Sequence, residues 1–529
     1  MSSSGDAPTI PIRRSPLTGI RSRLSRSGGH SSSETAVGAG VRTGLVALSA
    51  IVLLGLIVVI MAADRPSLLS PTTHLNYYPR WMAGPLGGLW PGMTGNSTTL
   101  KYLFSGAIVL MYVSYVLALR SAPGLPLRWI VGAILAVHLV FLLSPPLALT
   151  DLFNYINYGR MEAVHHLNPY TTIPISEPHD DPSYILSNWH QLLSPYGPMF
   201  TLLTFVVVPL GVAGSFWALK AILMMASLGI IFLVWRCAKL LGRDPRSAIV
   251  LVGLNPIVLV WGLGGDHNDF LMVFCIMLGF YLLLRGGAGA ATPGESPPDG
   301  ASLAAGHSWS LRPSRSWLVP LSGVDMGVGA TFVLAAAIKA SGAVLIPVLL
   351  AGLLRTPRRL VQVVLGMILC GAVVGAMSLA AFGLHIPDLS TQGRLVTSES
   401  VPNLIGLLFG AGGESEGLRY AMSLVLIVSV ALCGLLAWRR RESITASGWA
   451  SLALLLTLSW VLPWYVLWIL PLAALSPSRR LRSAALLVGV YLIVAWAPAS
   501  GLLWNAIGFH PEKTSLGRLH QRYVRELLN

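Results

Sequence analysis

Long apolar runs separated by short polar segments dominate the chain. Many of these runs approach the ~20 residues that a helix needs to cross a hydrocarbon core of roughly 30 Å. The short apolar/polar alternation of an outer-membrane β-barrel is absent. The pattern therefore predicts an all-α, polytopic integral membrane protein. We predict about 13 transmembrane helices, at 45–61, 101–119, 129–149, 216–235, 248–264, 270–284, 324–338, 344–354, 360–382, 420–438, 448–462, 466–475 and 484–499.

One apolar run, 199–212, does not fit a simple alternation of crossings. The polar loop before it is predicted on the outer side of the membrane, and the basic cluster after 216–235 on the inner side. Two full crossings cannot connect those sides. We therefore expect 199–212 to form a re-entrant or half-membrane helix, which is allowed where the backbone lines a cavity within the protein.

The composition supports a membrane protein and excludes several other classes. The chain is 54% hydrophobic and 11% charged, whereas a soluble domain has roughly 25% charged residues. Its net charge of +15 comes from short Arg clusters between apolar runs, which is typical of cytoplasmic loops rather than of a nucleic-acid-binding surface. The four cysteines lie in or at the ends of apolar runs, so we expect neither a disulfide framework nor a thiolate metal site.

The polar segments divide the chain into a membrane domain and two tails. Residues 1–41 are rich in Ser, Gly and Arg and are predicted to be a disordered, basic, cytoplasmic tail. The membrane domain, 42–500, has predicted outer loops at 63–100 and 150–197 and a flexible cytoplasmic loop at 286–318. The C-terminal tail, 501–529, stays open: the parity of the spans places it outside, whereas its basic residues favour the inside.

Orientation from basic residues alone brings four polar groups to one side of the membrane. They are the 151–195 loop, the 265–269 turn, the turn at Lys339 and the loop that holds Arg394. Convergence on one face is what a shared site requires.

The first of these groups begins where a predicted span ends. If 151–161 is helical, Asp151, Asn154, Tyr155 and Tyr158 share one face. A carboxylate beside aromatic rings suits a sugar, and the guanidinium of Arg160 on the adjacent face can bind phosphate oxygens bidentately. In the alternative interpretation, Asp151 caps an interfacial helix and the tyrosines belong to the aromatic belt of the membrane surface.

The second group is the turn Gly265-Asp266-His267-Asn268-Asp269 between two apolar runs. A charge inside a membrane costs at least ~2.5 kcal/mol on insertion scales, so such residues usually have a function or a partner. We expect these side chains to hydrogen-bond sugar hydroxyls, and Asp and His are also suitable metal ligands. The alternative is a solvated turn in which Asp269 caps the next helix.

Two isolated cations complete the candidate residues. Lys339 and Arg394 could each pair with a phosphate, or else snorkel to the interface. Nothing in the sequence resembles a phosphate-binding glycine loop, a nucleotide-binding fold or a zinc motif. A nucleotide-sugar donor handled in the cytoplasm is therefore not expected.

Four motifs, in this order, resemble those of the GT-C glycosyltransferases. The resemblance lies in Asp151-Leu-Phe-Asn-Tyr-Ile-Asn-Tyr-Gly-Arg160 with Asn168-Pro169-Tyr170, Ser194-Pro-Tyr196-Gly-Pro198, Asn255-Pro256 with the 265–269 turn, and Pro463-Trp464-Tyr465 with Trp468. The combination looks most like the actinobacterial polyprenol-phosphomannose-dependent α-1,6-mannosyltransferases, which build the mannan backbone of lipomannan and lipoarabinomannan. It covers about residues 45–500.

The resemblance implies an inverting transferase in the cytoplasmic membrane, with its catalytic cavity on the extracytoplasmic face. The donor would be polyprenyl-phosphate mannose and the acceptor a lipid-anchored mannan. Asp151 would be the general base, and Tyr196, Trp464 and Tyr465 would contact substrate. No cofactor is certain: a divalent metal is compatible with the family, but Asp151-Leu-Phe-Asn154 is not a strict Asp-x-Asp motif.

Two alternatives stay open at this stage. The same fold could transfer another polyprenyl-phosphate sugar, such as arabinofuranose or glucose. A transporter or flippase for a lipid-linked glycan would instead predict inverted repeats and charges along a path open to both sides. No clear repeat is present, and the polar residues gather on one predicted face.

Overall fold

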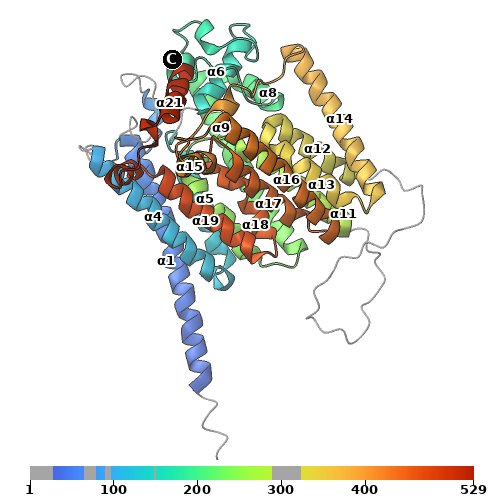
Figure 1. Cartoon of the computed structure of the whole chain (residues 1–529). Coiled ribbons are helices and arrows are strands. Elements are labelled where there is room, and N and C mark those ends of the chain that lie inside the picture. The colour runs from blue at the N-terminus through green and yellow to red at the C-terminus, as the bar shows by residue number, and fades with distance from the viewer. Residues whose placement is uncertain (1–27, 65–78, 90–96, 148–150, 289–322, 529) are drawn as a thin grey trace, which may run out of the picture.

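The computed structural model describes residues 28–64, 79–89, 97–147, 151–288 and 323–528. Within these ranges every regular element is a helix and there is no strand (Figure 1), which confirms the all-α prediction. The predictions made for residues 1–27, for 65–78 and 90–96 of the first outer loop, and for 289–318 of the cytoplasmic loop lie outside the described residues.

Helices of very different length form the bundle. Six helical stretches in the described residues are long and apolar enough to cross a membrane, or seven if a bent pair counts as one. The six are Gly40–Ala63, Thr98–Gly124, Pro198–Leu240, Asp269–Gly287, Pro357–Phe382 and Glu416–Arg440, and the bent pair joins Arg479–Trp496 to Ser500–Ala506. Shorter apolar helices lie at Leu127–Leu142, Gly323–Ile338, Ala340–Leu353, Ser443–Thr457 and Pro463–Leu475. The total of about 13 spans counts these shorter helices as crossings and stays a prediction.

The elements used below carry the labels of Figure 1. They are α1 (Gly28–Asp64), α4 (Ser97–Ser121), α5 (Leu127–Leu142), α6 (Asp151–Ala163), α7 (Pro182–Leu186), α8 (Pro198–Val207), η3 (Val208–Leu210), α9 (Gly211–Leu240), α10 (Pro245–Gly253), η4 (Val258–Leu263), α11 (Asp269–Ala288), α12 (Gly323–Ile338), η5 (Ala340–Leu345), α13 (Ile346–Leu353), α14 (Pro357–Phe382), η6 (Gln392–Arg394), α15 (Val401–Leu408), α16 (Glu416–Arg440), α17 (Ser443–Thr457), η7 (Pro463–Trp468), α18 (Leu470–Leu475), α19 (Arg479–Trp496), α20 (Ser500–Ala506), η8 (Pro511–Lys513) and α21 (Ser515–Leu528).

The first helix begins within the predicted N-terminal tail. α1 begins at Gly28, inside the 1–41 stretch that was predicted to be disordered, and its first part projects from the bundle in Figure 1. The apolar span that follows accounts for this, because extending an existing helix adds one hydrogen bond per residue and needs no new nucleus.

The predicted half-membrane helix corresponds to α8. It has 10 residues, so its length of about 15 Å is half the thickness of a hydrocarbon core. It ends at η3, and Gly211, with φ of 70°, turns the chain into the 30-residue α9. α8 packs on α6 and α12, within the protein, as such a helix requires.

The predicted span 248–264 is broken at Asn255-Pro256. Pro256 lacks an N–H and cannot continue the hydrogen-bond ladder of α10. The Oδ1 atom of Asn255 accepts instead from the backbone N atoms of Ile257 and Val258, at 3.0 and 3.3 Å. The π-helical η4 follows. A broken helix therefore leads directly into the 265–269 turn.

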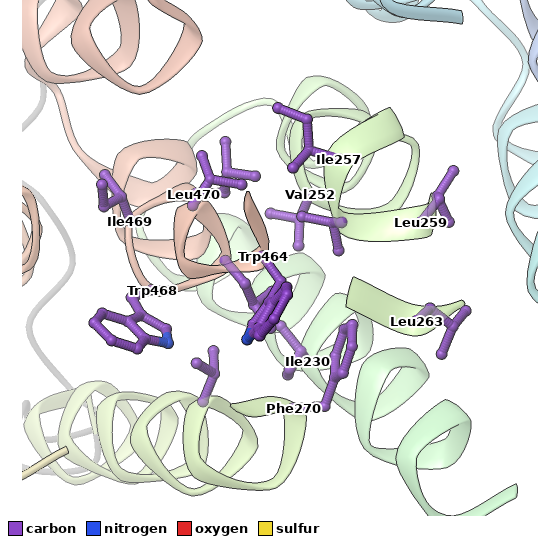
Figure 2. Packing of buried hydrophobic residues seen from close by; sticks show 14 of the residues in the cluster. Ile230, Val252, Ile257, Leu259, Leu263, Phe270, Trp464, Trp468, Ile469 and Leu470 are labelled. Carbon is purple, nitrogen blue, oxygen red and sulfur yellow. The ribbon is translucent and has the colours of Figure 1, made fainter. Parts of the chain in front are cut away.

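Large apolar side chains fill the space behind this turn. Figure 2 shows the indole rings of Trp464 and Trp468 among the side chains of Val252, Ile257 and Phe270, which belong to segments far apart in the chain. Trp464 is 2% exposed and Phe270 is fully buried. Burial of this kind contributes roughly 1.5–3 kcal/mol per large apolar side chain, and it fixes η7 against α11 and η4.

The C-terminal tail packs on the same end of the bundle as the 164–197 segment. The backbone N of Gln191 donates to the carbonyl O of Leu527 at 3.1 Å, and the hydroxyl of Tyr523 donates to the carbonyl O of Thr391 at 3.1 Å. Figure 1 shows α21 and α6 at the same end of the bundle. The tail therefore lies with the 164–197 segment, as the parity of the spans predicts, and the side of the membrane that both occupy stays a prediction.

This packing makes a topological prediction. In intact cells, Asp180→Cys and Glu526→Cys, both exposed, should react alike with a membrane-impermeant maleimide. Arg440→Cys, at the far end of the 25-residue α16, should show the opposite accessibility. Because the free cysteines are present in every variant, the unsubstituted protein supplies the background. Opposite labelling of positions 180 and 526 would contradict the structure.

Candidate functional site

Asp151 and His267 meet at the centre of the candidate site. Asp151 is the first residue of α6, and its Oδ2 atom lies 3.2 Å from Nδ1 of His267. The Asp151 side chain is 15% exposed, whereas that of His267 is 1% exposed. A carboxylate is thus held against an imidazole with one side still accessible, which is the arrangement that a general base requires.

The turn that carries His267 has a strained backbone. Asp266 has φ of 58°, which costs about 1–3 kcal/mol for a residue other than glycine. At Gly265 a Cβ atom would come within 2.3 Å of the carbonyl O of Trp261, so the position tolerates only glycine. The turn is also tied to the end of α5, because the backbone N of Leu147 donates to the carbonyl O of Gly264 at 2.7 Å.

A buried ion pair stabilises this strained turn. Nζ of Lys220, in the middle of α9, lies 3.0 Å from each carboxylate oxygen of Asp266. The two side chains are 1% and 2% exposed. The carboxylate of Asp266 was predicted to bind a sugar hydroxyl, but in the structure it neutralises a lysine inside the bundle.

A second ion pair lies at the other end of the turn. Oδ2 of Asp269 accepts from Nζ of Lys339 at 2.7 Å, and Oδ1 accepts from Nε1 of Trp468 at 2.6 Å. Lys339 Nζ also lies 5.0 Å from the ring centroid of Tyr465, within cation–π range. The Lys339 side chain remains 20% exposed. An ammonium group has three donors, and two of them are not used by Asp269.

Several buried polar atoms around Asp151 have no hydrogen-bond partner among the described residues. They are both ring nitrogens of His267, the amide N and O of Asn268, and Nε1 of Trp464. His267 is close to Asp151 but not aligned for a hydrogen bond, and its ring stacks on Trp464 with centroids 3.3 Å apart. Unsatisfied buried groups are rare in native proteins. Their concentration here indicates a site for a polar ligand.

Tyr155 and Tyr196 connect α6 to this turn and to the Lys339 turn. The backbone N of Asn268 lies 3.4 Å from the hydroxyl of Tyr155, and the rings of Tyr155 and Tyr196 make an edge contact at 4.8 Å. Next to Tyr196, the backbone N of Gly197 donates to the carbonyl O of Ile338 at 3.1 Å. A Cβ atom at Gly197 would lie 2.1 Å from the carbonyl O of Ala337, so the close approach depends on glycine.

Asn154 and Tyr158, the other two residues of the predicted α6 face, bind the 164–197 segment. Oδ1 of Asn154 accepts from the backbone N atoms of Asn188 and Trp189, at 3.2 and 3.3 Å. The hydroxyl of Tyr158 donates to the carbonyl O of Leu192 at 2.7 Å. Both side chains are buried. They hold the 164–197 segment against α6.

Arg160 also binds the 164–197 segment. Nη2 of Arg160 lies 2.7 Å from Oδ2 of Asp181, and Nε2 of His165 lies 3.0 Å from the same oxygen. Burial alone would raise the pKa of Asp181, but hydrogen bonds from Arg160, Ser183 and His165 outweigh it and hold the pKa well below its usual range. Arg160, predicted to contact phosphate, is occupied here by a carboxylate.

Arg394 lies apart from the other candidates. It ends η6 and its side chain is exposed. Its guanidinium takes part in none of the hydrogen bonds or ion pairs that link the other candidate residues. Over the part of the chain that the structure describes, no group of three or more His, Cys, Asp or Glu side chains is arranged to hold a metal ion.

Sequence reasoning missed Lys220, and it quoted Trp468 only as part of a motif. The available signal for Lys220 was a single lysine within the otherwise apolar 211–235 stretch, since an intramembrane charge usually has a partner. Nothing in the sequence identifies that partner as Asp266, because the two residues are 46 positions apart.

Removing Lys220 should test the role of the buried pair. Lys220→Met leaves the Asp266 carboxylate buried and unpaired, which should destabilise the protein by about 3–5 kcal/mol. The double variant Lys220→Met/Asp266→Asn should recover most of this loss, because no buried charge remains. Thermal unfolding of the detergent-solubilised protein measures both effects. Lys239→Met, on an exposed position of α9, is the matched control, and an equal effect of the two single variants would refute the assignment.

Glu177, in the loop that covers α6, should make stability depend on pH. Burial raises the pKa of its carboxyl to about 8, a shift that the neighbouring Asn157 and Arg160 only partly oppose. The neutral carboxyl therefore stabilises the fold fully below about pH 4.5, and this contribution is lost as pH rises to about 8.

Glu177→Gln should consequently become more stable to heat than the unsubstituted protein as pH rises from about 4.5 to about 8. The difference in stability between the two proteins should vanish at the acidic end of this range. The substitution Asp180→Asn, at an exposed neighbouring position, provides the control. A stability difference that stayed constant across the window would show that ionisation of Glu177 is not responsible.

Comparison with known proteins places these features in a family. A family model described as alpha-(1->6)-mannopyranosyltransferase, N-terminal domain, matches residues 41–355. A second, described as MptB C-terminal domain, matches residues 398–509. No solved structure matches the chain.

Two curated relatives come from Mycobacterium tuberculosis (strain ATCC 25618 / H37Rv), and both are named as alpha-(1->6)-mannopyranosyltransferases. One is 29% identical over 412 residues, which cover 69% of this chain and 68% of the relative. The other, designated A, is 26% identical over 431 residues, which cover 75% of each chain. The first family model alone spans more than half of the sequence and includes α6, the 265–269 turn and Lys339. This all-helical membrane protein therefore belongs to the alpha-(1->6)-mannopyranosyltransferase family.

Proposed function

We propose that the protein is an inverting α-1,6-mannosyltransferase that uses polyprenyl-phosphate mannose and extends an α-1,6-mannan of the lipomannan type. The reaction would take place on the outer face of the cytoplasmic membrane. The observation that carries the proposal is the accessible Asp151 carboxylate, which lies 3.2 Å from His267 among buried polar groups that have no hydrogen-bond partner within the described part of the chain.

The proposed reaction assigns the proton to Asp151. The carboxylate removes the proton from the 6-hydroxyl of the acceptor sugar while the acceptor oxygen attacks the anomeric carbon of the donor. The bond from that carbon to the phosphate oxygen breaks, and polyprenyl phosphate leaves with the electron pair. Attack from the opposite side converts a β-linked phosphomannose into an α-mannoside. His267 keeps the Asp151 carboxylate in place, since its own position is set by the stack on Trp464.

The leaving phosphate needs a cation more than it needs an acid, because negative charge develops on it in the transition state. Lys339 is the best candidate in the structure. It is partly exposed, it is positioned by Asp269 at 2.7 Å, and it retains two donors for phosphate oxygens. Arg160, by contrast, is paired with Asp181, and Arg394 lies outside the cluster.

An apolar groove supports a lipid-linked donor. A cavity of about 660 Å³ lies between α13 and α16, and residues from Val344 to Leu354 form one wall while residues from Leu426 to Trp438 form the other. Its first lining residue, Val344, is five positions after Lys339. A polyprenyl chain in this groove would leave its phosphate near the Lys339 turn, so the groove and the cation suit the two ends of one ligand.

The alternatives differ in donor or in class. Nothing in the geometry distinguishes mannose from arabinofuranose or glucose, and the family membership favours mannose. A transporter would need a polar path between the two faces, whereas the buried polar groups of the candidate site concentrate around one turn. A panel of polyprenyl-phosphate sugars separates the transferase hypotheses.

Asp151→Asn should reduce mannosyl transfer by about 10²–10⁴-fold, because the amide cannot accept the proton. The assay combines purified protein, polyprenyl-phosphate mannose and a short α-mannoside, and follows formation of the α-1,6 product. Asp388→Asn, an exposed carboxylate of another segment, should retain activity. Near-normal transfer by Asp151→Asn would exclude the base assignment, and transfer from a nucleotide sugar alone would exclude the donor.

A further inference from the structure

A second cavity lies outside the Asp151 cluster, between the C-terminal helix α21 and the membrane domain. Its volume is about 470 Å³, within the range of roughly 300–1,000 Å³ that is typical of small-ligand sites. The segment 396–399 and the residues Trp460 and Trp496 form its inner wall, and α21 with the preceding Pro511 forms the outer wall.

The lining of this cavity suits a neutral, hydroxyl-rich ligand. Two half-buried indoles, of Trp460 and Trp496, are combined with polar side chains, in which one carboxylate is balanced by one guanidinium: Glu399, His520, Gln521 and Arg525. Flat aromatic faces pack against the C–H surfaces of a sugar ring, while carboxylate and amide groups exchange hydrogen bonds with its hydroxyls. Tryptophans of an interfacial belt would face lipid, whereas these two line a cavity between α21 and the membrane domain.

One short segment of chain links the cavity wall to the reaction site. Trp460 lines the cavity, Trp464 stacks on His267, and Trp468 donates to Asp269. Trp464 is four positions after Trp460, so their Cα atoms are at most about 14 Å apart. Trp460 also contacts Trp189, with ring centroids at 6.3 Å, and the backbone N of Trp189 donates to Asn154 of α6 at 3.3 Å.

Hydrogen bonds at both ends of α21 hold the outer wall of the cavity in place. The hydroxyl of Thr514 donates to the carbonyl O of Gly412, Tyr523 donates to Thr391, and Leu527 accepts from Gln191. These contacts fasten both ends of α21 to segments from different parts of the chain. A helix attached only by an apolar face would not need them, so the position of α21 over the cavity is specified.

We propose that this cavity binds mannosyl units of the acceptor chain that lie away from the reacting hydroxyl, and that α21 is the wall that closes over them. The inference rests on the proposed function and goes beyond it, because it assigns chain-length recognition to a site outside the reaction centre. The formal charges of the lining residues Glu399 and Arg525 cancel, so the lining carries no net positive charge that would select the donor phosphate.

The test compares acceptors of different length on the full-length, detergent-solubilised enzyme. Trp496→Ala should raise KM for α-1,6-linked mannotetraose at least about fivefold, as loss of one aromatic contact implies. KM for methyl α-mannoside and for the donor should not change, because neither reaches the cavity. Trp496→Phe should restore most of the effect, since it keeps an aromatic face.

Trp504→Ala is the matched control. Trp504 lies on the adjacent α20, packs on Phe509 with ring centroids at 5.4 Å and does not line the cavity, so it should leave both KM values unchanged. Equal KM for mannotetraose in the Trp496→Ala variant and the unsubstituted enzyme would overturn the proposal. A rise of the same size for methyl α-mannoside would also overturn it, because the effect would then belong to the reaction centre.

A binding measurement separates this proposal from the proposed function. Isothermal titration of mannotetraose into the protein without donor should show binding that is weakened by Trp496→Ala and not by Trp504→Ala. If polyprenyl-phosphate mannose supported no transfer, the proposed function would fail, while this titration would still decide whether the cavity binds the glycan. Binding that is insensitive to Trp496→Ala would place the acceptor elsewhere.

Discussion

The candidate site depends on the pairing of charges that are buried inside a membrane domain. Asp266 and Asp269 flank His267 in one turn, and each has its own lysine, Lys220 from α9 and Lys339 from the turn after α12. Leaving either carboxylate unpaired would cost several kcal/mol. The two ion pairs therefore fasten the turn to two different parts of the bundle, and they hold the strained backbone that presents His267 to Asp151.

This arrangement divides the acidic residues into structural and chemical roles. The carboxylates of Asp266 and Asp269 are fully committed to lysines and, for Asp269, to the indole of Trp468. Among the described residues Asp151 has no lysine partner; it lies beside His267 and keeps an accessible side. This contrast supports the proposal that Asp151 accepts the proton from a substrate. The strained backbone at Asp266 and the glycine at position 265 allow the turn to bring His267 to the Asp151 carboxylate.

A second level of organisation surrounds this centre. Asn154, Tyr158 and Arg160 use one side of α6 to hold the 164–197 segment, and that segment in turn binds the end of α21 through Gln191. The short run from Trp460 to Trp468 connects the cavity under α21 with the reaction centre. Acceptor recognition and chemistry would thus share one continuous piece of chain, η7 and the residues before it.

The sequence by itself determined the all-helical membrane fold, since apolar runs of this length have few other stable states in a lipid environment. It also predicted that the candidate segments lie on one side of the membrane, because basic residues indicate the orientation of each loop. Asp151 and the 265–269 turn could be singled out for the same reason: polar residues beside hydrocarbon are costly unless they are used.

Only the tertiary structure decided which side chains meet. Periodicity placed Asp151, Asn154, Tyr155 and Tyr158 on one face of α6, but the turn reaches only the first part of that face and the 164–197 segment covers the rest. In the sequence, Arg160 and Asp266 both look free to bind a substrate. In the structure, Arg160 pairs with Asp181, 21 positions away, and Asp266 pairs with Lys220, 46 positions away. Such pairings depend on how helices from distant parts of the chain pack, and local sequence carries no record of that packing.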